Sequence, residues 1–445
     1  MKKTLQNYFE LEAKHTSIKR ELLAGATTFI TMVYIIFVNP TMMAETGMDY
    51  GASFVGTCLA AAVACFAMGV LANWPVALAP GMGLNAFFTY TVVGEMGYSW
   101  QVALSAVFIA GVLFFVISVT PLRRWILESI PSSLRISMGA GIGLFIGFIG
   151  LKSSGIIVSN PVNYVSLGDL TKAEPYLGLL GFLIITVLSI RKIPGAIMLG
   201  IITITVISIL ANKVEFSGFF SSPPSLAPVL FELDFSGALD VGIISVVLTF
   251  LFVNLFDTAG TLLAVATSAN LIDDKGRIEN LDQALKADSA SSIVGTMVGC
   301  APVTSYVESS AGVSAGGRSG LTAVFVGCFF CLAIFISPLA SIIPAYATAG
   351  ALIYVAMIML GGLEKLEWSD QSELIPALIT VSMIPLSFSI ADGIALGFMS
   401  YVIIKVFTGR RDQVTSAAWF LACLLYTSDA ADDMQCVDLG GRRII

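Results

Sequence analysis

The stretch APGMGLNAFF, residues 79–88, interrupts what would otherwise be a continuous membrane-spanning segment. Apolar runs lie on both sides of it, yet it contains a proline, two glycines and Asn85. Within a bilayer, broken backbone is tolerated only where protein or water satisfies its polar groups. Close helix packing accounts for small residues such as Gly83, but not for Pro80 or Asn85. The stretch therefore predicts an unwound backbone and an Asn85 amide at membrane depth, a pattern typical of a transporter binding site.

The composition of the chain is that of a membrane protein. Of its 445 residues, 56% are hydrophobic and only 12% are charged, whereas soluble domains carry about 25% charged residues. Apolar runs recur from Leu23 to Phe407, and about 20 such residues cross the hydrocarbon core as a helix. The first run lacks a small-residue cleavage site, so we expect it to stay in the mature protein. We therefore expect a lipid bilayer around the chain and no nucleic-acid partner.

Hydropathy and helix-breaking residues divide the chain into fourteen predicted spans. They cover residues 24–44, 52–72, 81–97, 101–120, 133–152, 176–190, 194–212, 241–268, 287–300, 305–317, 321–337, 341–361, 372–389 and 391–407. Basic residues gather in the N-terminal tail and in the connections on the same side, which the positive-inside rule places in the cytoplasm. We therefore expect a multi-pass protein of the inner (plasma) membrane with a cytoplasmic N-terminus.

The two halves of the chain echo one another. Ala79 begins APGMGLNAFF and Ala301 begins APVTSYVESS, and each stretch opens the third predicted span of its half. Fourteen spans divide as seven plus seven, and an odd-numbered repeat inserts its second copy upside down. The pattern predicts an all-α polytopic fold made of two inverted seven-span repeats.

The predicted organisation follows from these repeats. It consists of a cytoplasmic tail (1–20), a first repeat (21–212), an extracytoplasmic loop (213–240), a second repeat (241–407) and a cytoplasmic segment (408–425). Residues 426–445, YTSDAADDMQCVDLGGRRII, are abruptly polar and show no periodicity. They resemble a translated adapter or frameshift, so we assign them no function and expect the natural C-terminus to be missing.

Two acidic residues lie deep inside predicted spans. Asp257 lies about sixteen residues into the eighth span, and Glu308 follows the second interruption directly. A charged side chain at membrane depth costs at least about 2.5 kcal/mol, so both positions predict a function. A buried carboxylate can take up a proton, which proton coupling requires. Solvated or capping roles are expected instead for the acids assigned to loops and span ends, which are Glu128, Asp240, Asp288 and Asp392.

The remaining residues exclude several kinds of site. His15, in the N-terminal tail, is the single histidine of the sequence, so no histidine relay is expected in the membrane. Without a histidine cluster, paired cysteine motifs or a calcium-type loop, neither a metal nor a cofactor is predicted. We interpret Cys328 and Cys331 as small apolar residues rather than a redox pair. A protease-like fragment at Asp169 has no partner aspartate in a span, so an enzyme is not predicted.

Four stretches together resemble the AzgA-like purine permeases of the nucleobase-ascorbate transporter superfamily. They are ELLAGATTFITMVYIIFVNP (21–40), ALAPGMGLNAFFTYTVV (77–93), LFDTAGTLLAVA (255–266) and TSYVESSAGVSAGGRSGLTAV (304–324). The resemblance extends from Glu21 to about Leu425. It implies two inverted seven-span repeats split into a core and a gate domain, with short extended strands in spans three and ten. The substrate is expected between those strands and span eight.

The resemblance also implies a purine-binding site and a mechanism. Its substrate contacts, carried over position by position, are Asn85, Asp257 and Glu308, with further contacts at Phe87, Thr261 and Ser309. Carboxylates and an amide can read the polar edge of a purine while an aromatic ring stacks on its face. The implied activity is proton-coupled uptake of hypoxanthine, guanine or adenine by alternating access.

Proton coupling is expected at one of the two acids. Related uracil permeases have a histidine one turn after the span-eight acid, and Thr261 occupies that place here. Coupling through a histidine is therefore not supported, and which of Asp257 and Glu308 carries the proton stays open. The related carriers are commonly dimers, so a homodimer is compatible with the resemblance.

Other functions stay open as alternatives. A carrier for uracil, xanthine or an inorganic anion would use the same architecture, although two facing acids repel an anion. A membrane enzyme or scaffold predicts that Asp257→Asn and Glu308→Gln leave purine uptake unchanged.

Overall fold

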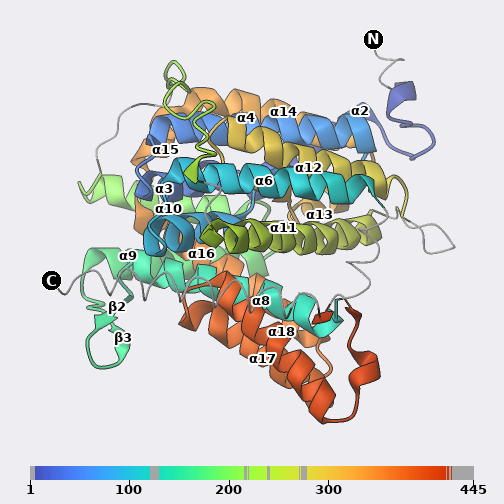
Figure 1. Cartoon of the computed structure of the whole chain (residues 1–445). Helices are drawn as coiled ribbons and strands as arrows, with labels where there is room; N and C mark the ends of the chain where they lie inside the picture. The colour runs from blue at the N-terminus through green and yellow to red at the C-terminus, as the bar shows by residue number, and fades with distance from the viewer. Residues whose placement is uncertain are drawn as a thin grey trace.

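The computed structural model describes residues 6–120, 130–214, 218, 220–237, 241–269, 271, 278–416, 418, 419 and 422. Glu128, Asp240 and residues 426–445 lie outside these ranges. Long helices run side by side across the molecule (Figure 1). One end carries the N-terminal tail and is called the tail end; the other carries a β-hairpin and is called the hairpin end.

The first half of the chain is mainly helical. Its elements are α2 (Ile18–Met32), α3 (Ile35–Glu45), α4 (Tyr50–Ala67), β1 (Leu78–Pro80), α5 (Met82–Ala86), α6 (Trp100–Val119), α8 (Ser132–Ser153), the hairpin strands β2 (Ile157–Asn160) and β3 (Tyr164–Leu167), α9 (Ala173–Ile190) and α10 (Ala196–Leu210). Two π-helical segments, η1 (Met68–Ala72) and η2 (Phe87–Glu95), extend α4 and α5.

The second half has a matching order of elements. They are α11 (Val241–Ser268), α12 (Leu281–Met297), β4 (Val303–Ser305), α13 (Ser309–Ser314), α14 (Gly320–Ala333), α15 (Ser337–Ile342), α16 (Ala345–Leu360), α17 (Gln371–Leu386) and α18 (Ile390–Phe407). Short 3-10 segments, η4 (Ile334–Ile336), η5 (Gly361–Lys365) and η6 (Arg411–Gln413), lie between or after these helices.

Local sequence explains where many helices begin. The Asp49 carboxylate accepts a hydrogen bond from the Ala52 N–H at the start of α4. The Ser99 hydroxyl accepts one from the Val102 N–H at the start of α6. The Ser389 hydroxyl does the same for Asp392 at the start of α18. Such caps satisfy backbone donors that the first helical turn leaves without partners.

The apolar helices are of membrane-spanning type. Among the described residues, nine helical segments are long and apolar enough to cross a membrane, and α10 and α17 are shorter apolar helices. An apolar surface suited to contact lipid is seen on α6, which exposes Val112, Leu113, Phe115 and Val116. The helical membrane class is therefore confirmed, while the exact count of fourteen spans stays a prediction.

The helices pack in two groups, each drawn from both halves of the chain. The α4 group contains α2, α3, α4, α6 and α11–α14 together with β1, β4, α5 and η2, and the α8 group contains α8–α10 and α16–α18. Figure 1 shows α8, α17 and α18 on one side of the molecule and α4, α12 and α14 on the other. Interleaving of the halves is what an inverted repeat produces when equivalent helices pack together.

Two helix boundaries differ from the sequence expectation. The single span predicted at 24–44 is divided into α2 and α3 at Val33 and Tyr34. The span predicted at 287–300 begins at Leu281, because Asp282, Lys286 and Asp288 are part of α12 despite their charge. A prediction based on hydropathy and charge therefore placed the start of this helix too late in the chain.

Candidate functional site

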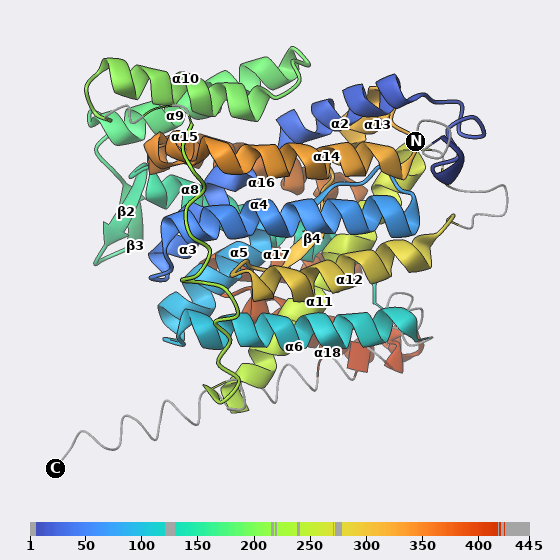
Figure 2. The ribbon, with the colours of Figure 1, turned by 90° about the horizontal axis from the view of Figure 1, so that it is seen from above.

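The two interrupted stretches meet as a two-stranded antiparallel sheet. β1 pairs with β4 in a register that sets Leu78 opposite Ser305 and Ala79 opposite Thr304. All six strand residues are buried. The Tyr306 hydroxyl also donates a 2.5 Å hydrogen bond to the Pro80 carbonyl oxygen. The strands lie between α4 and α12 in the middle of the molecule (Figure 2). The backbone N–H and C=O groups of the two interrupted stretches therefore pair with each other inside the protein.

Asn85 is a buried amide without a partner. It lies in α5, directly after β1, and its side chain is 0% exposed. Within the described part of the chain, neither its oxygen nor its nitrogen makes a hydrogen bond. Leaving such a group unpaired costs about 1–3 kcal/mol, so the position is suited to a ligand that supplies both a donor and an acceptor.

Phe87 follows Asn85 by two residues in the chain. Its ring is 1% exposed and meets the Phe250 ring of α11 edge to face, with centroids 5.0 Å apart. This contact joins the broken span to α11. The Phe87 ring is therefore packed on one side against α11, the helix that carries Asp257.

Glu308 is held by a tyrosine at the entry of α13. Its Oε1 accepts a 2.9 Å hydrogen bond from the Tyr34 hydroxyl, which comes from the break between α2 and α3. The next residue, Ser309, is buried, and its hydroxyl accepts the Ala77 N–H at 3.0 Å. Ser309 therefore ties α13 to the chain entering β1, and Tyr34 orients the Glu308 carboxyl.

Asp257 lies midway along α11 and is nevertheless exposed. Its carboxyl interacts with the Thr304 side chain of β4 and lies within electrostatic range of Glu308. Thr261, one turn further on, is partly exposed, and Gly260 has open space on its side-chain side. The structure thus brings Asp257, Glu308 and the strand pair together.

The exposed face of α11 continues from Asp257 to the tail end. It includes Gly260, Ala264, Thr267 and Ser268, which recur at helical spacing. Leu263, 50% exposed, also lies on this face, but its other side chains are small or polar, unlike the large apolar ones that α6 exposes. Water, rather than lipid, is the matching surrounding for such a face, so we name it the α11 polar face.

Asp288 corrects a sequence expectation. We expected a solvated or capping group, but its side chain is 0% exposed inside α12. The carboxylate accepts hydrogen bonds from the Thr258 hydroxyl at 2.8 Å and the Ser305 hydroxyl at 3.1 Å. The expectation was wrong because α12 begins earlier than hydropathy indicates. Asp288 therefore joins α11, α12 and β4 directly behind Asp257.

Sequence reasoning also missed Tyr34 and Tyr306. Both are buried tyrosines whose hydroxyls contact the site, one at Glu308 and one at Pro80. A signal was available in each case, because a tyrosine hydroxyl inside an apolar run needs a partner. The partner itself could not be read from the sequence.

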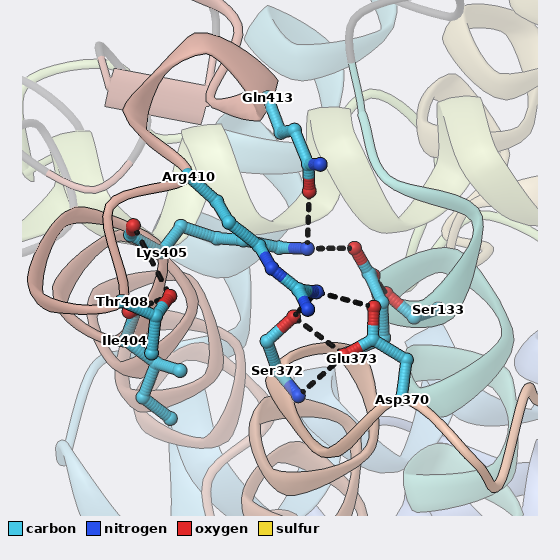
Figure 3. Close-up of polar contacts among 9 residues, drawn as sticks. All are labelled: Ser133, Asp370, Ser372, Glu373, Ile404, Lys405, Thr408, Arg410 and Gln413. Atoms are coloured by element: carbon cyan, nitrogen blue, oxygen red, sulfur yellow. Dashed lines mark hydrogen bonds and ion pairs between the residues drawn. The ribbon is translucent and has the colours of Figure 1, made fainter.

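A second polar cluster lies apart from this site (Figure 3). It lies where the N-terminal ends of α8 and α17 meet the C-terminal end of α18. Lys405, 1% exposed, pairs with Glu373 at 2.7 Å and donates to Gln413 at 2.8 Å. Arg410 pairs with Asp370 at 2.8 Å. Hydrogen bonds from Ser372, followed by the charge of Arg410, lower the pKa of Asp370. Opposite charges are matched throughout the cluster, so it joins helices rather than selecting a charged ligand.

Metal sites and disulfide sites are each made by typical groups of side chains. They contain no cluster of three or more histidine, cysteine or acidic side chains that could hold a metal ion. The described cysteines, Cys328 and Cys331 included, are free thiols.

Comparisons with known proteins place this arrangement among transporters. The model of the permease family Xan_ur_permease matches residues 19–396. Adenine permease AdeQ of Escherichia coli is 49% identical over 421 residues, which cover 95% of this chain and 95% of that protein. Guanine/hypoxanthine permease PbuO of Bacillus subtilis is 41% identical over 426 residues, which cover 94% of this chain and 98% of that protein.

Solved structures share the fold at low identity. The transmembrane domain of the cyanobacterial bicarbonate transporter BicA matches with a TM-score of 0.65 at 15% identity. The match covers 85% of this chain and 97% of that chain. At this identity the likeness shows the fold alone.

Proposed function

Because the chain belongs to the permease family, we propose that it takes up purine nucleobases across the plasma membrane by proton-coupled alternating access. Relatives at 41–49% identity include proteins named adenine permease and guanine/hypoxanthine permease. The single observation that carries the proposal is the fully buried Asn85 amide, which has no partner among the described residues and lies in α5, directly after β1 of the strand pair. The substrate is therefore a purine base such as adenine, guanine or hypoxanthine.

The chemistry of the site suits a flat heterocycle. A purine presents N–H donors and acceptor nitrogens along its edge, which match an amide and carboxylates. We assign the edge to Asn85, Asp257 and Glu308, with Thr261 and Ser309 at the margin. Phe87 supplies aromatic surface for the face of the base.

An inorganic anion is the less suitable substrate. The bicarbonate carrier shares the fold only. Two carboxyl groups next to the strand pair repel an anion when ionised, and they attract N–H donors of a neutral base. Asp257 and Glu308 therefore favour a purine on this fold.

The packing supports an alternating-access mechanism between the two helix groups. We propose that the α4 group is the core domain and the α8 group the gate domain. At the hairpin end the groups touch: the Lys152 ammonium lies 5.4 Å from the Phe388 ring centroid and 6.0 Å from that of Tyr90. At the tail end the α11 polar face is exposed. We interpret the arrangement as a carrier whose binding site is open at the tail end, and we assign the tail end to the cytoplasm.

The proposed cycle uses the acids for coupling. In the state that faces outward, Asp257 or Glu308 takes a proton and the purine binds across Asn85 and both acids. Movement of the α4 group against the α8 group then exposes the site at the tail end. Proton and purine leave along the α11 polar face.

Uptake of radiolabelled purines into cells that lack their own purine carriers tests the proposal. We expect accumulation of adenine, guanine or hypoxanthine that a protonophore abolishes and that excess sulfate, bicarbonate, uracil or xanthine does not reduce. Asp257→Asn and Glu308→Gln should remove accumulation, while Asp169→Asn, an exposed loop carboxylate, serves as the matched control. Accumulation by the double variant would show that the site is wrong.

A further inference from the structure

Glu21 is a buried carboxylate that accepts five hydrogen bonds. It lies in the first turn of α2 and is 0% exposed. Its Oε1 accepts from the Thr16 hydroxyl at 2.7 Å and the Arg318 N–H at 3.0 Å. Its Oε2 accepts from the Ser319 N–H at 3.3 Å and from the N–H and hydroxyl of Thr322 at 3.2 and 2.5 Å. Every donor is uncharged, and three of them are backbone groups.

These donors belong to the start of α14 and the turn before it. Ser319 is the N-cap of α14, and Thr322 lies in its first turn. A carboxylate at this place satisfies N–H groups that the helix leaves free and interacts favourably with the helix dipole. Glu21 on α2 thus fixes the turn between α13 and α14 from another element.

The same turn holds the far end of α13. The Arg318 guanidinium donates to the carbonyl oxygens of Val313 at 2.7 Å and Gly317 at 2.8 Å, at the C-terminal end of α13. The Gly320 N–H donates to the Asn73 side chain at 2.7 Å. Because Glu21 binds the Arg318 backbone, it sets where this end of α13 is anchored.

α13 also packs against α2 without clearance. A Cβ added at Gly312 would lie 2.0 Å from the Thr28 hydroxyl oxygen and 2.6 Å from the Ala24 carbonyl oxygen. α13 spans only Ser309–Ser314, which is about 9 Å of helix, and Glu308 directly precedes it. A helix this short moves as a unit, so a shift at the turn reaches Glu308.

We propose that Glu21 is a positioning residue for Glu308. It acts through the α13–α14 turn and the α2–α13 contact, and it does not touch the substrate. The inference rests on the proposed function, since it assigns Glu308 to purine binding. Loss of the Glu21 bonds should weaken purine binding in molecules that are still folded, which a role in stability alone would not do.

The test measures purine affinity on purified, folded protein by calorimetry, together with the unfolding temperature. Glu21→Gln should raise the purine Kd about tenfold, because its amide group sets N–H donors against the backbone N–H groups. Thr322→Val removes one hydroxyl donor and should raise Kd about threefold, whereas Thr322→Ser, which keeps the hydroxyl, should restore wild-type affinity. Gly312→Ala should raise Kd about tenfold by displacing α13.

Gly361→Ala is the matched control, because a Cβ at Gly361 meets no atom within 4 Å. Its Kd should equal that of the wild type. Should Glu21→Gln fail to fold, Thr322→Val and Gly312→Ala decide the question. Unchanged Kd in these variants, with only a lower unfolding temperature, overturns the positioning role. A wild-type protein that binds no purine overturns the proposed function itself, which is a distinct result.

Discussion

At the scale of single residues, some polar groups of the site have hydrogen-bond partners within the protein and others have none. Tyr34 orients Glu308, whereas Asn85 has no partner among the described residues. Asp288 is fully bonded and Asp257 is exposed. Asn85, which has no intramolecular partner, therefore gains the most from a ligand, whereas a carboxylate oriented by one donor keeps further acceptor capacity for a substrate.

Asn85 should matter for binding and not for folding. Asn85→Leu removes an amide that costs about 1–3 kcal/mol when unpaired, so the unfolding temperature without ligand should be unchanged or higher. Purine affinity should fall at least tenfold, which is about 1.4 kcal/mol. Thermal unfolding in detergent with and without purine measures both effects.

Asn39→Leu is the matched control, since the Asn39 amide donates to Thr57 at 2.6 Å. This variant should lower the unfolding temperature. An equal loss of stability in the Asn85 and Asn39 variants would contradict the proposed role of Asn85.

Asp288 should matter for both purine binding and the stability of the fold. Asp288→Leu leaves the Ser305 hydroxyl without its acceptor, while the Thr258 hydroxyl keeps the Thr304 hydroxyl at 3.0 Å as a partner. The variant should cost about 1–3 kcal/mol of stability. Asp288→Asn retains one acceptor oxygen and should cost less. Because Ser305 lies in β4, purine Kd should rise together with the loss of stability. A leucine variant as stable as the wild type would disprove the structural role.

At the scale of elements, short pieces of backbone are held by side chains from distant elements. β1 and β4 contain three residues each and depend on each other for their hydrogen bonds. α13 depends on Glu21 and Ser309 at its two ends. In the α8 group, the cluster of Figure 3 joins α8 to α17 and α18 by charge.

The ion pair between the buried Lys405 and the partly exposed Glu373 should be coupled. Lys405→Met leaves Glu373 without its cation and should lower stability, by less than the roughly 3–5 kcal/mol typical of a fully buried pair. The double variant Lys405→Met, Glu373→Leu should recover most of this loss, because no charge remains unpaired. Arg410→Met is the control, since Arg410 is 45% exposed and an exposed pair contributes at most about 1 kcal/mol. Additive losses in the double variant would contradict the coupling.

At the scale of the whole molecule, the two ends differ. Phe388 contacts Tyr90, Phe145 and Phe148 at the hairpin end, with ring centroids 4.9–6.1 Å apart. The Thr91 hydroxyl donates to the Phe388 carbonyl oxygen at 3.0 Å. The Tyr90 and Thr91 contacts, which come from η2, join the two groups at this end, whereas Phe145 and Phe148 lie on α8 within the α8 group. The α11 polar face is exposed at the other end.

Thiol labelling of purified protein, with Cys328 and Cys331 replaced by serine, tests this asymmetry. Thr91→Cys should react slowly, because Thr91 is 2% exposed, and Thr267→Cys on the α11 polar face should react rapidly. Addition of Phe388→Ala should accelerate labelling at position 91 and leave position 267 unchanged. Equal reactivity of the two single variants would show that the hairpin end is not closed.

The sequence by itself determined the membrane class, the two interrupted stretches, and Asn85, Asp257 and Glu308 as the residues to examine. Hydropathy, helix breaking and the cost of a charge in lipid are local properties, so a single window of sequence contains them. Only the tertiary structure decided that the interruptions pair as β1 and β4, that Asp288 is buried, and that Glu21 anchors the turn after α13. Those facts depend on contacts between residues far apart in the chain, and burial depends on where a helix begins and which face it turns inward.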